Sequence, residues 1–133
     1  NQQLCQFIFL AGGAFQIIHQ TGKAHISLLT ELYRQQNISA VVFAYQQDLQ
    51  QYYLLADIII CRAGAGTLFE TLFFKKPCIT IPLETVSTDH QLDNAYALRD
   101  EHPELIVVLR QQALLSDPGL LFTTVSHLLD QPR

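Results

Sequence analysis

The stretch Asp57-Ile-Ile-Ile-Cys-Arg-Ala-Gly-Ala-Gly-Thr-Leu-Phe-Glu70 decides the fold of this chain. It opens with an apolar β-branched run, residues 58–60, of the kind that a parallel strand buried on both faces needs. A loop of small residues follows at 63–66, and a helical pattern begins at Thr67. Glycines let a backbone approach a phosphate, and the N-terminus of a helix favours negative charge. The stretch therefore predicts half of a nucleotide-binding unit.

The glycine loop also has a purely structural interpretation. Its spacing completes neither a dinucleotide fingerprint nor a P-loop, which would end in Lys-Ser or Lys-Thr. Thr67 and Glu70 fit a capping box, in which Thr67 caps the helix and Glu70 bonds back to the N–H of the cap residue. A carboxylate at this helix start would also face a ligand in a cleft, so Glu70 is a candidate for either role.

The composition indicates one globular domain. The chain has 133 residues, 49% of them hydrophobic, which is enough for a core. A net charge of −4 without a basic stripe argues against nucleic acid as a partner. No apolar run approaches the roughly 20 residues that cross a bilayer, and no signal peptide is visible. Cys5, Cys61 and Cys78 lie in apolar stretches without metal-ligand spacing, so we expect buried, reduced thiols and no metal.

The remaining chain alternates predicted strands and helices. An apolar helical stripe covers residues 3–10 and ends at two glycines. Strands are predicted over residues 15–19, 39–45, 58–60, 78–81 and 105–109, and helices over residues 23–37 and 48–55, from 67, over 92–98 and from 117. Strands separated by helices in this way predict an α/β, Rossmann-like parallel sheet with helices on both faces.

In such a sheet, ligands bind beyond the carboxyl ends of the strands. Four segments should therefore converge there: residues 19–23, 43–45, 62–70 and 83–94. The last of these begins with a loop that we expect to be mobile. His90, Gln91 and Asn94 follow it in the first turn of a helix.

Four side chains near these strand ends each have two interpretations. His19 and His90 face the predicted cleft, yet a lone histidine is more often a structural hydrogen-bonding residue than a catalyst. Arg62 could bring positive charge to a diphosphate or form a surface ion pair. Lys23 stands at a helix start, where its charge opposes the dipole, so it either meets a ligand charge or is solvated.

Four motifs resemble the MurG family of bacterial transferases: His19-Gln-Thr-Gly-Lys23, residues 56–70, Ile81-Pro82, and His90-Gln91 followed by Asn94-Ala95. That family moves N-acetylglucosamine from UDP-N-acetylglucosamine onto the undecaprenyl-linked muramoyl-pentapeptide in peptidoglycan synthesis. The resemblance covers roughly residues 1–130. It implies an incomplete UDP-sugar-binding domain over residues 1–133, the C-terminal half of an inverting GT-B hexosyltransferase.

The resemblance also implies roles for individual residues. Ala44 matches the residue whose backbone recognises the uracil, and Gln91 matches a glutamine that contacts the donor sugar. The run Ala65-Gly66-Thr67-Leu68-Phe69-Glu70 matches the stretch that lines the nucleotide, with Glu70 on the ribose hydroxyls. Secondary candidates for the donor site are Phe43, Gly64, His90, His19 and Arg62. The implied site holds the diphosphate with N–H groups at a helix start, without a metal or cofactor.

The sequence departs from the family pattern in several places. Gly66 stands where the family often carries a bulkier apolar residue. The family's phosphate-binding glycine loop should lie just before Asn1. The amino-terminal half of the enzyme, which binds the lipid-linked acceptor and supplies the catalytic base, should also precede Asn1. The closing C-terminal helix is at least partly absent. We therefore expect no turnover by this chain on its own, and the resemblance implies peripheral attachment of the whole enzyme to the cytoplasmic face of the bacterial inner membrane.

Two other functions stay open at this point. One is the donor-binding catalytic subunit of a two-chain UDP-N-acetylglucosamine transferase for lipid-linked oligosaccharide, although such a subunit would begin with its own first strand and glycine loop. The other is a non-catalytic UDP-sugar-binding domain. Titration with UDP, UDP-N-acetylglucosamine and an adenine nucleotide separates uridine-specific binding from the rest.

Overall fold

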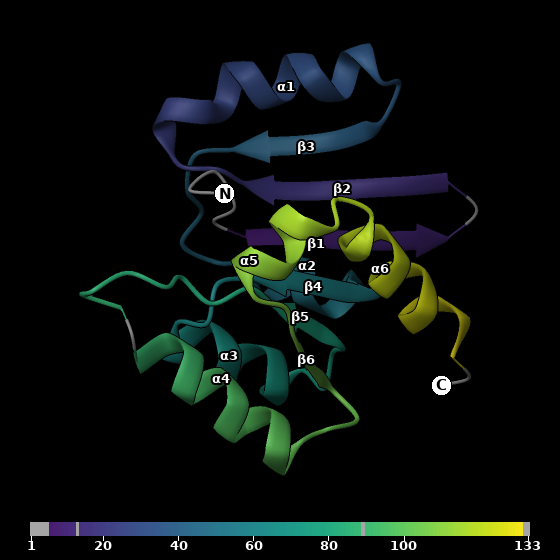
Figure 1. Ribbon diagram of the computed structural model, residues 1–133. Coiled ribbons are helices and arrows are strands. Elements are labelled where there is room, and N and C mark those ends of the chain that lie inside the picture. The colour runs from purple at the N-terminus through teal and green to yellow at the C-terminus, as the bar shows by residue number, and fades with distance from the viewer. Residues whose placement is uncertain (1–5, 13, 89, 132–133) are drawn as a thin grey trace.

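The computed structural model describes residues 6–12, 14–88 and 90–131, with the backbone alone for residues 6–12, 14 and 15. The strands are β1 (Gln6–Gly12), β2 (Ala14–Gln20), β3 (Ser39–Phe43), β4 (Ile58–Cys61), β5 (Cys78–Thr80) and β6 (Ile106–Val108). They form one sheet in the order β3-β2-β1-β4-β5-β6 (Figure 1). The helices are the 3-10 helix η1 (Lys23–His25), α1 (Ile26–Gln35), α2 (Gln50–Leu55), α3 (Ala65–Phe73), α4 (His90–Glu101), α5 (Gln111–Ser116) and α6 (Leu120–Asp130).

Every strand except β1 runs in the same direction. β2 pairs with β3 in parallel, as β4 does with β5 and β5 with β6. β1 lies between β2 and β4 and is antiparallel to both, so its arrow points the opposite way in Figure 1. The carboxyl ends of the other strands therefore meet at one edge of the sheet. The predicted α/β parallel sheet is confirmed, with β1 as its exception.

The prediction of a helix over residues 3–10 is wrong where the structure describes that segment, because residues 6–12 form β1. Residues 3–5 lie outside the described part. The run Phe7-Ile-Phe-Leu10 is short and wholly apolar, and periodicity alone does not separate a buried strand from a buried helix in such a run. At the centre of the sheet, the backbone of β1 pairs with β2 on one side and with β4 on the other. These hydrogen bonds favour the strand over a helix.

The β4 strand is buried on both faces, as its β-branched run predicts. Ile59 packs in the core under α2, α3 and α4, where Tyr53, Leu68 and Ala95 are buried. Ile58 and Ile60 point the other way, into a core closed by buried side chains of α6. Each fully buried isoleucine contributes about 1.5–3 kcal/mol of transfer free energy. The two cores together hold the middle of the sheet between layers of helices.

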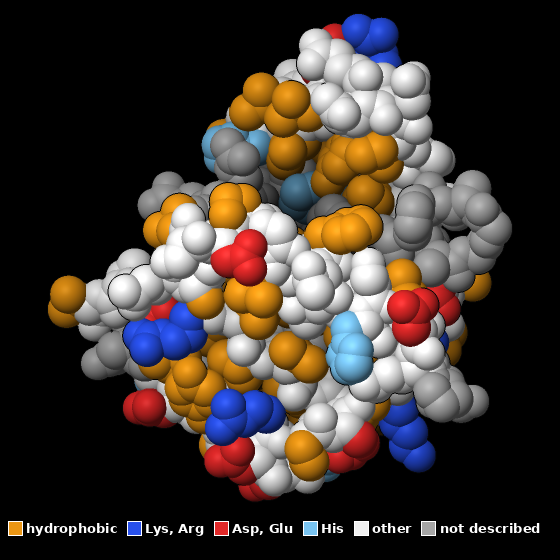
Figure 2. All heavy atoms as spheres, turned by 45° about the vertical axis from the view of Figure 1, so that its right-hand side comes forward, with side chains coloured by type: hydrophobic (Ala, Val, Ile, Leu, Met, Phe, Trp, Pro, Cys, Tyr) orange, Lys and Arg blue, Asp and Glu red, His pale blue; other side chains and the backbone are white. Residues whose placement is uncertain are grey.

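Helix α1 is less completely covered. It packs against β3, and its Leu28 and Leu32 side chains remain 50% and 43% exposed. Figure 2 shows a hollow below this helix, with hydrophobic side chains on its upper wall. Helix α5 is the element that the sequence did not predict. The helix is only six residues long, and its N-cap residue, Arg110, makes no side-chain cap hydrogen bond. Neither a hydrophobic periodicity nor a capping residue therefore predicts it from the sequence.

The two described cysteines are buried free thiols, as predicted, while Cys5 lies outside the described residues. The sulfur atoms of Cys61 and Cys78 are 3.6 Å apart. The hydrogen bond with Cys78 and the burial of the thiol raise the pKa of Cys61, which keeps it in the unreactive protonated form. The described residues contain no group of three metal-ligating side chains. Within the same residues, no helix is both long and apolar enough to cross a membrane.

His19 and Tyr33 form a polar contact between β2 and α1. His19 is 5% exposed, and its Nδ1 lies 2.8 Å from the Tyr33 hydroxyl. Burial raises the pKa of Tyr33 to about 12. His19 is therefore held inside the protein by α1.

This raised pKa predicts a loss of stability at alkaline pH. An unfolded tyrosine ionises near pH 10, about two units before Tyr33 does in the folded chain. The stabilisation relative to Tyr33→Phe should thus be complete below about pH 10 and should fall as the pH rises toward 12. Because the ring is partly exposed, solvent screening limits this fall to about 1 kcal/mol. Urea unfolding of both proteins from pH 9 to 12 measures it.

Tyr45→Phe is the control for this experiment, because the Tyr45 side chain is 74% exposed. Parallel stability curves for the natural chain and Tyr33→Phe across this pH range would show that the buried hydroxyl does not couple ionisation to folding.

Candidate functional site

A cleft of about 600 Å³ opens beside the carboxyl ends of the strands. One wall is formed by residues 45–49 of the loop that joins β3 to α2, and the other by helix α3; Ala44, at the start of that loop, does not line the cleft. The residues that line it are Gln20, Tyr45, Gln46, Gln47, Asp48, Leu49, Gln50, Tyr53, Thr67, Phe69, Glu70, Phe73 and Phe74. Three of the four segments predicted to converge at this edge thus contribute to one cleft.

The end of β2 holds the loop wall in place. The Thr21 N–H donates to the Phe43 carbonyl and the Gly22 N–H to the Ala44 carbonyl, each over 3.0 Å. These two bonds continue the pairing of β2 and β3 beyond the strands. Gly22 makes its bond at φ 76° and ψ 164°, a backbone conformation that essentially only glycine adopts. The Gly22 of the His-Gln-Thr-Gly motif is therefore required by the turn itself.

Helix α3 begins two residues earlier than predicted, and the capping box is wrong. Gly64 is the N-cap residue, and no side chain hydrogen-bonds at the cap. The carbonyl of Gly64 accepts the Leu68 N–H at 3.0 Å, so Thr67 lies inside the first turn instead of capping it. The first N–H groups of an α-helix have no partner within the helix. Here no side chain replaces that partner, which leaves the start of α3 available to an anion.

The backbone around this helix start is open to approach. A Cβ atom added at Gly64 or Gly66 would meet no atom within 4 Å, and Gly64 has the ordinary extended values φ −68° and ψ 137°. Neither the conformation of Gly64 nor the packing around either residue requires a glycine in the fold. The space in front of the two residues can admit a ligand group close to the main chain.

The residues of α3 divide between the cleft and the core. Thr67, Phe69 and Glu70 line the cleft, and Glu70 is exposed. Leu68 is 0% exposed and packs in the core under the sheet, so only its backbone could meet a ligand. Ala65 is exposed at the first helical position. The cleft-lining residues include no Lys or Arg. Residues 64–66, at the helix start, do not line the cleft themselves but directly precede Thr67, which does.

The structure keeps three of the other sequence candidates away from the cleft lining. His19 is turned toward Tyr33 of α1. Arg62 follows β4 and donates through Nη1 to the Ile81 carbonyl at 3.2 Å and to Gln111 Oε1 at 2.6 Å. It therefore joins the end of β5 to α5. Phe43 packs into the core, with its ring stacked on that of Tyr52 at 5.9 Å between centroids.

Gln91 and His90 belong to a second group at the same sheet edge. Both are at the start of α4, where His90 is exposed. The Gln91 Oε1 atom accepts the Leu83 N–H at 3.0 Å. This bond ties the start of α4 to the loop that follows β5. Neither residue lines the 600 Å³ cleft.

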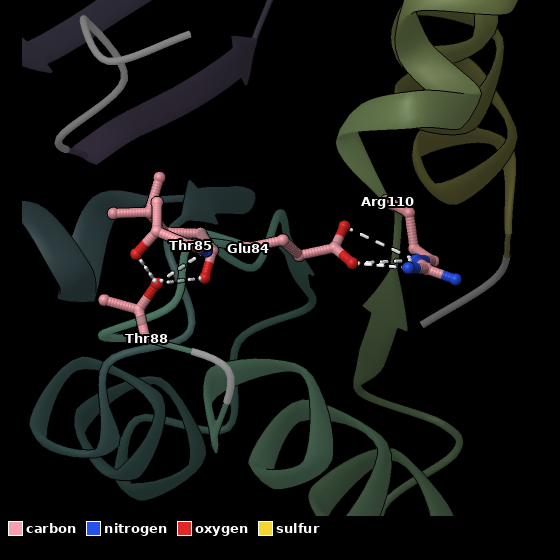
Figure 3. Close-up of polar contacts among 5 residues, drawn as sticks. Glu84, Thr85, Thr88 and Arg110 are labelled. Atoms are coloured by element: carbon pink, nitrogen blue, oxygen red, sulfur yellow. Dashed lines mark hydrogen bonds and ion pairs between the residues drawn. The ribbon is translucent and has the colours of Figure 1, made fainter.

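The loop before α4, which we expected to be mobile, carries a set of internal hydrogen bonds (Figure 3). The Thr88 hydroxyl donates to the Leu83 carbonyl at 2.6 Å and accepts the Thr85 N–H at 3.0 Å. On the other side, Glu84 and Arg110 point toward each other and form an ion pair. The hydrogen bond to Glu84 raises the pKa of Arg110. The loop is thus tied both to itself and to the start of α5.

Sequence reasoning placed Gln20 and Tyr45 in segments that converge at this edge but did not single them out as site residues, and it missed Gln46 and Tyr53 of the cleft. Gln20 lies within the His-Gln-Thr-Gly motif, and this position was the available signal. Tyr45 immediately follows Ala44, but nothing in the sequence distinguishes it from a solvated loop tyrosine.

Comparison with known proteins identifies the family. The model of the glycosyltransferase family 28 C-terminal domain matches residues 1–133. A UDP-N-acetylglucosamine–N-acetylmuramyl-(pentapeptide) pyrophosphoryl-undecaprenol N-acetylglucosamine transferase of Geobacter sulfurreducens is 35% identical, over 92% of this chain and 32% of that protein. The transferase of the same name from Myxococcus xanthus is 34% identical, over 100% of this chain and 34% of its own length.

A solved structure agrees with these relatives. The crystal structure of MurG from Acinetobacter baumannii superposes with a TM-score of 0.74 and 28% identity, over 88% of this chain and 33% of that one. The chain thus spans about a third of the length of the relatives that it matches. With the family model matched from end to end and the fold shared with a solved relative, this chain belongs to glycosyltransferase family 28, in its C-terminal domain.

Proposed function

We propose that this chain binds UDP-N-acetylglucosamine, as the donor-binding part of an enzyme that transfers N-acetylglucosamine to the lipid-linked muramoyl-pentapeptide of peptidoglycan synthesis. One observation carries the proposal: Thr67 and Glu70 of α3 line a single cleft with the 45–49 loop at the carboxyl ends of the strands, and the start of the same helix has no side-chain cap. The relatives are named for this transfer.

Each part of the donor has a counterpart at this edge of the sheet. The backbone of Ala44, held by the Gly22 N–H, recognises the uracil. The two carboxylate oxygens of Glu70 accept hydrogen bonds from the two ribose hydroxyls, which are neighbours on the sugar ring. Gln91 reaches the N-acetylglucosamine with its amide NH₂, since its oxygen is already bonded to the Leu83 N–H. His90, beside it, is exposed and is a second candidate for contact with the sugar.

The diphosphate binds in front of Gly64 and the first residues of α3. The N-terminus of a helix carries about half a positive elementary charge, and its free N–H groups point toward the ligand. When the sugar is transferred with inversion, UDP leaves with added negative charge on its diphosphate. Preorganised N–H donors stabilise such a developing charge. The chain's contribution to catalysis is thus to hold the donor and the leaving group.

The acceptor side of the reaction belongs to the part of the enzyme outside this chain. A general base there takes the proton of the acceptor hydroxyl. Because the acceptor is anchored in lipid, the whole enzyme associates peripherally with the cytoplasmic face of the inner membrane. The chain itself spans about a third of the length of the relatives, and their remaining length is enough for an acceptor-binding domain.

Replacement of Glu70 tests the ribose contact. Glu70→Ala should weaken UDP binding by about 10- to 100-fold, since a hydrogen bond to a charged group contributes about 1.5–3 kcal/mol. Isothermal titration calorimetry with UDP measures the change. Glu101→Ala, at the exposed far end of α4, is the matched control and should bind as the natural chain does. If Glu70→Ala and the control bind UDP with equal affinity, Glu70 does not contact the nucleotide.

A pair of glycine variants tests the approach of the diphosphate. Gly64→Ala fits the fold, because its Cβ meets nothing within 4 Å. It should nevertheless weaken UDP binding by about tenfold or more, since an added methyl group in a filled site costs about 1–3 kcal/mol. Its melting temperature should stay close to that of the natural chain.

Gly66→Ala is the matched variant within the helix. It should raise the free energy of unfolding by about 0.5–1 kcal/mol through helix propensity. Its UDP affinity should fall less than that of Gly64→Ala, because the family resemblance places a bulkier apolar residue there. Undiminished UDP binding by Gly64→Ala would mean that the diphosphate lies elsewhere.

A further inference from the structure

We propose that Gln20 is a positioning residue that gives the cleft its preference for a uracil base over an adenine. The inference rests on the proposed function and deepens it. Gln20 is the last residue of β2 and lines the cleft. Its Oε1 atom accepts the backbone N–H of Gln46 at 3.1 Å. A side chain of one strand thus fixes the backbone of the loop that follows the neighbouring strand.

Among the bonds that fasten the loop to the end of β2, this one lies farthest along the loop. The carbonyls of Phe43 and Ala44 accept backbone N–H groups in a pattern that resembles strand pairing, and the Phe43 carbonyl also accepts the Thr21 hydroxyl at 3.5 Å. Strand pairing has ended by residue 46, and the Gln20 side chain spans the remaining gap. Farther along, Asp48 Oδ1 accepts the Gln50 N–H at 3.0 Å, which fastens the loop to the start of α2.

Tyr45 lies between the two fastened positions, Ala44 and Gln46. Its side chain is 74% exposed and lines the cleft together with Phe69 and Glu70 of the opposite wall. Since the peptides on both sides of Tyr45 are held, the backbone fixes the point from which its exposed ring can reach and stack on a base. Held hydrogen-bonding groups at Ala44 and the anchored backbone of Tyr45 together discriminate between bases by shape and polarity. Without the Gln20 bond, the backbone at Gln46 can move and make room for a larger base.

The Gln46 side chain reinforces the same loop position. Its Oε1 atom accepts the Tyr52 hydroxyl at 3.4 Å, a longer and weaker bond than the one that Gln20 makes. Tyr52 in turn stacks on Phe43 at the end of β3. Gln46 is therefore fixed by its backbone to β2 and by its side chain to α2. Of the two contacts, the Gln20 bond is the shorter one and the one open to a clean chemical test.

Two variants of Gln20 separate the hydrogen bond from the bulk of the side chain. Gln20→Leu removes the acceptor, while Gln20→Glu keeps an acceptor oxygen at the same distance from the backbone. The dissociation constants of UDP and ADP are measured for each by calorimetry. Gln20→Leu should reduce the UDP-over-ADP preference by about tenfold, mainly through weaker UDP binding. Gln20→Glu should retain the preference, as should Gln16→Leu, a matched change at the exposed, opposite end of β2.

Amide hydrogen exchange reports the bond without any ligand. The Gln46 amide should exchange faster in Gln20→Leu than in the natural chain and in Gln20→Glu, while the core amide of Leu68 keeps its protection. A general loss of stability would instead speed exchange at both amides, which the melting temperatures would also show.

The outcomes distinguish this inference from the proposed function. If the natural chain prefers UDP and Gln20→Leu keeps that preference, or if its Gln46 amide exchanges no faster, the positioning role of Gln20 is overturned and the proposed function stands. If the natural chain does not prefer UDP to ADP, the proposed function fails and this inference fails with it.

Discussion

Burial of β4 on both faces is the constraint on which the rest of the structure depends. Ile59 needs the helices on one face of the sheet, and Ile58 and Ile60 need α6 on the other. A strand buried in this way must end at the edge of the sheet, and its chain must emerge there as a loop. Because all the strands except β1 point in one direction, the loops that follow them emerge at the same edge. The cleft is a consequence of this arrangement.

The site itself is built from two kinds of interaction. Apolar burial places α3: Leu68 enters the core, which turns Phe69 and Glu70 outward into the cleft. Hydrogen bonds place the opposite wall, because the 44–49 loop has few buried side chains and is held by bonds from the end of β2 and from Asp48. The helix wall is therefore anchored by core packing, whereas the loop wall depends on a few polar contacts. A site assembled in this way can change its specificity in the loop while its fold stays the same.

The sequence predicted the features that depend on long, repeated patterns. The β-branched run of β4, the alternation of strands and helices, and the convergence of residues 43–45 with residues 62–70 all appear in the structure. The predictions failed where a short segment is compatible with two local structures. The apolar run of β1 became a strand through pairing on both sides. At α3, Gly64 took the cap position that Thr67 fits equally well by type. Gln20 was not singled out because its contact joins residues 26 positions apart.

The most direct test of the central claim is a residue-by-residue map of where a uridine nucleotide binds. Amide chemical shifts of the ¹⁵N-labelled chain are recorded during titration with UDP. We expect saturable shifts on both walls of the cleft and next to them, at Ala44 and Tyr45 and from Gly64 to Glu70, with α1 and α6 unaffected. Shifts confined to other surfaces, or no saturable shift on either wall, would contradict it.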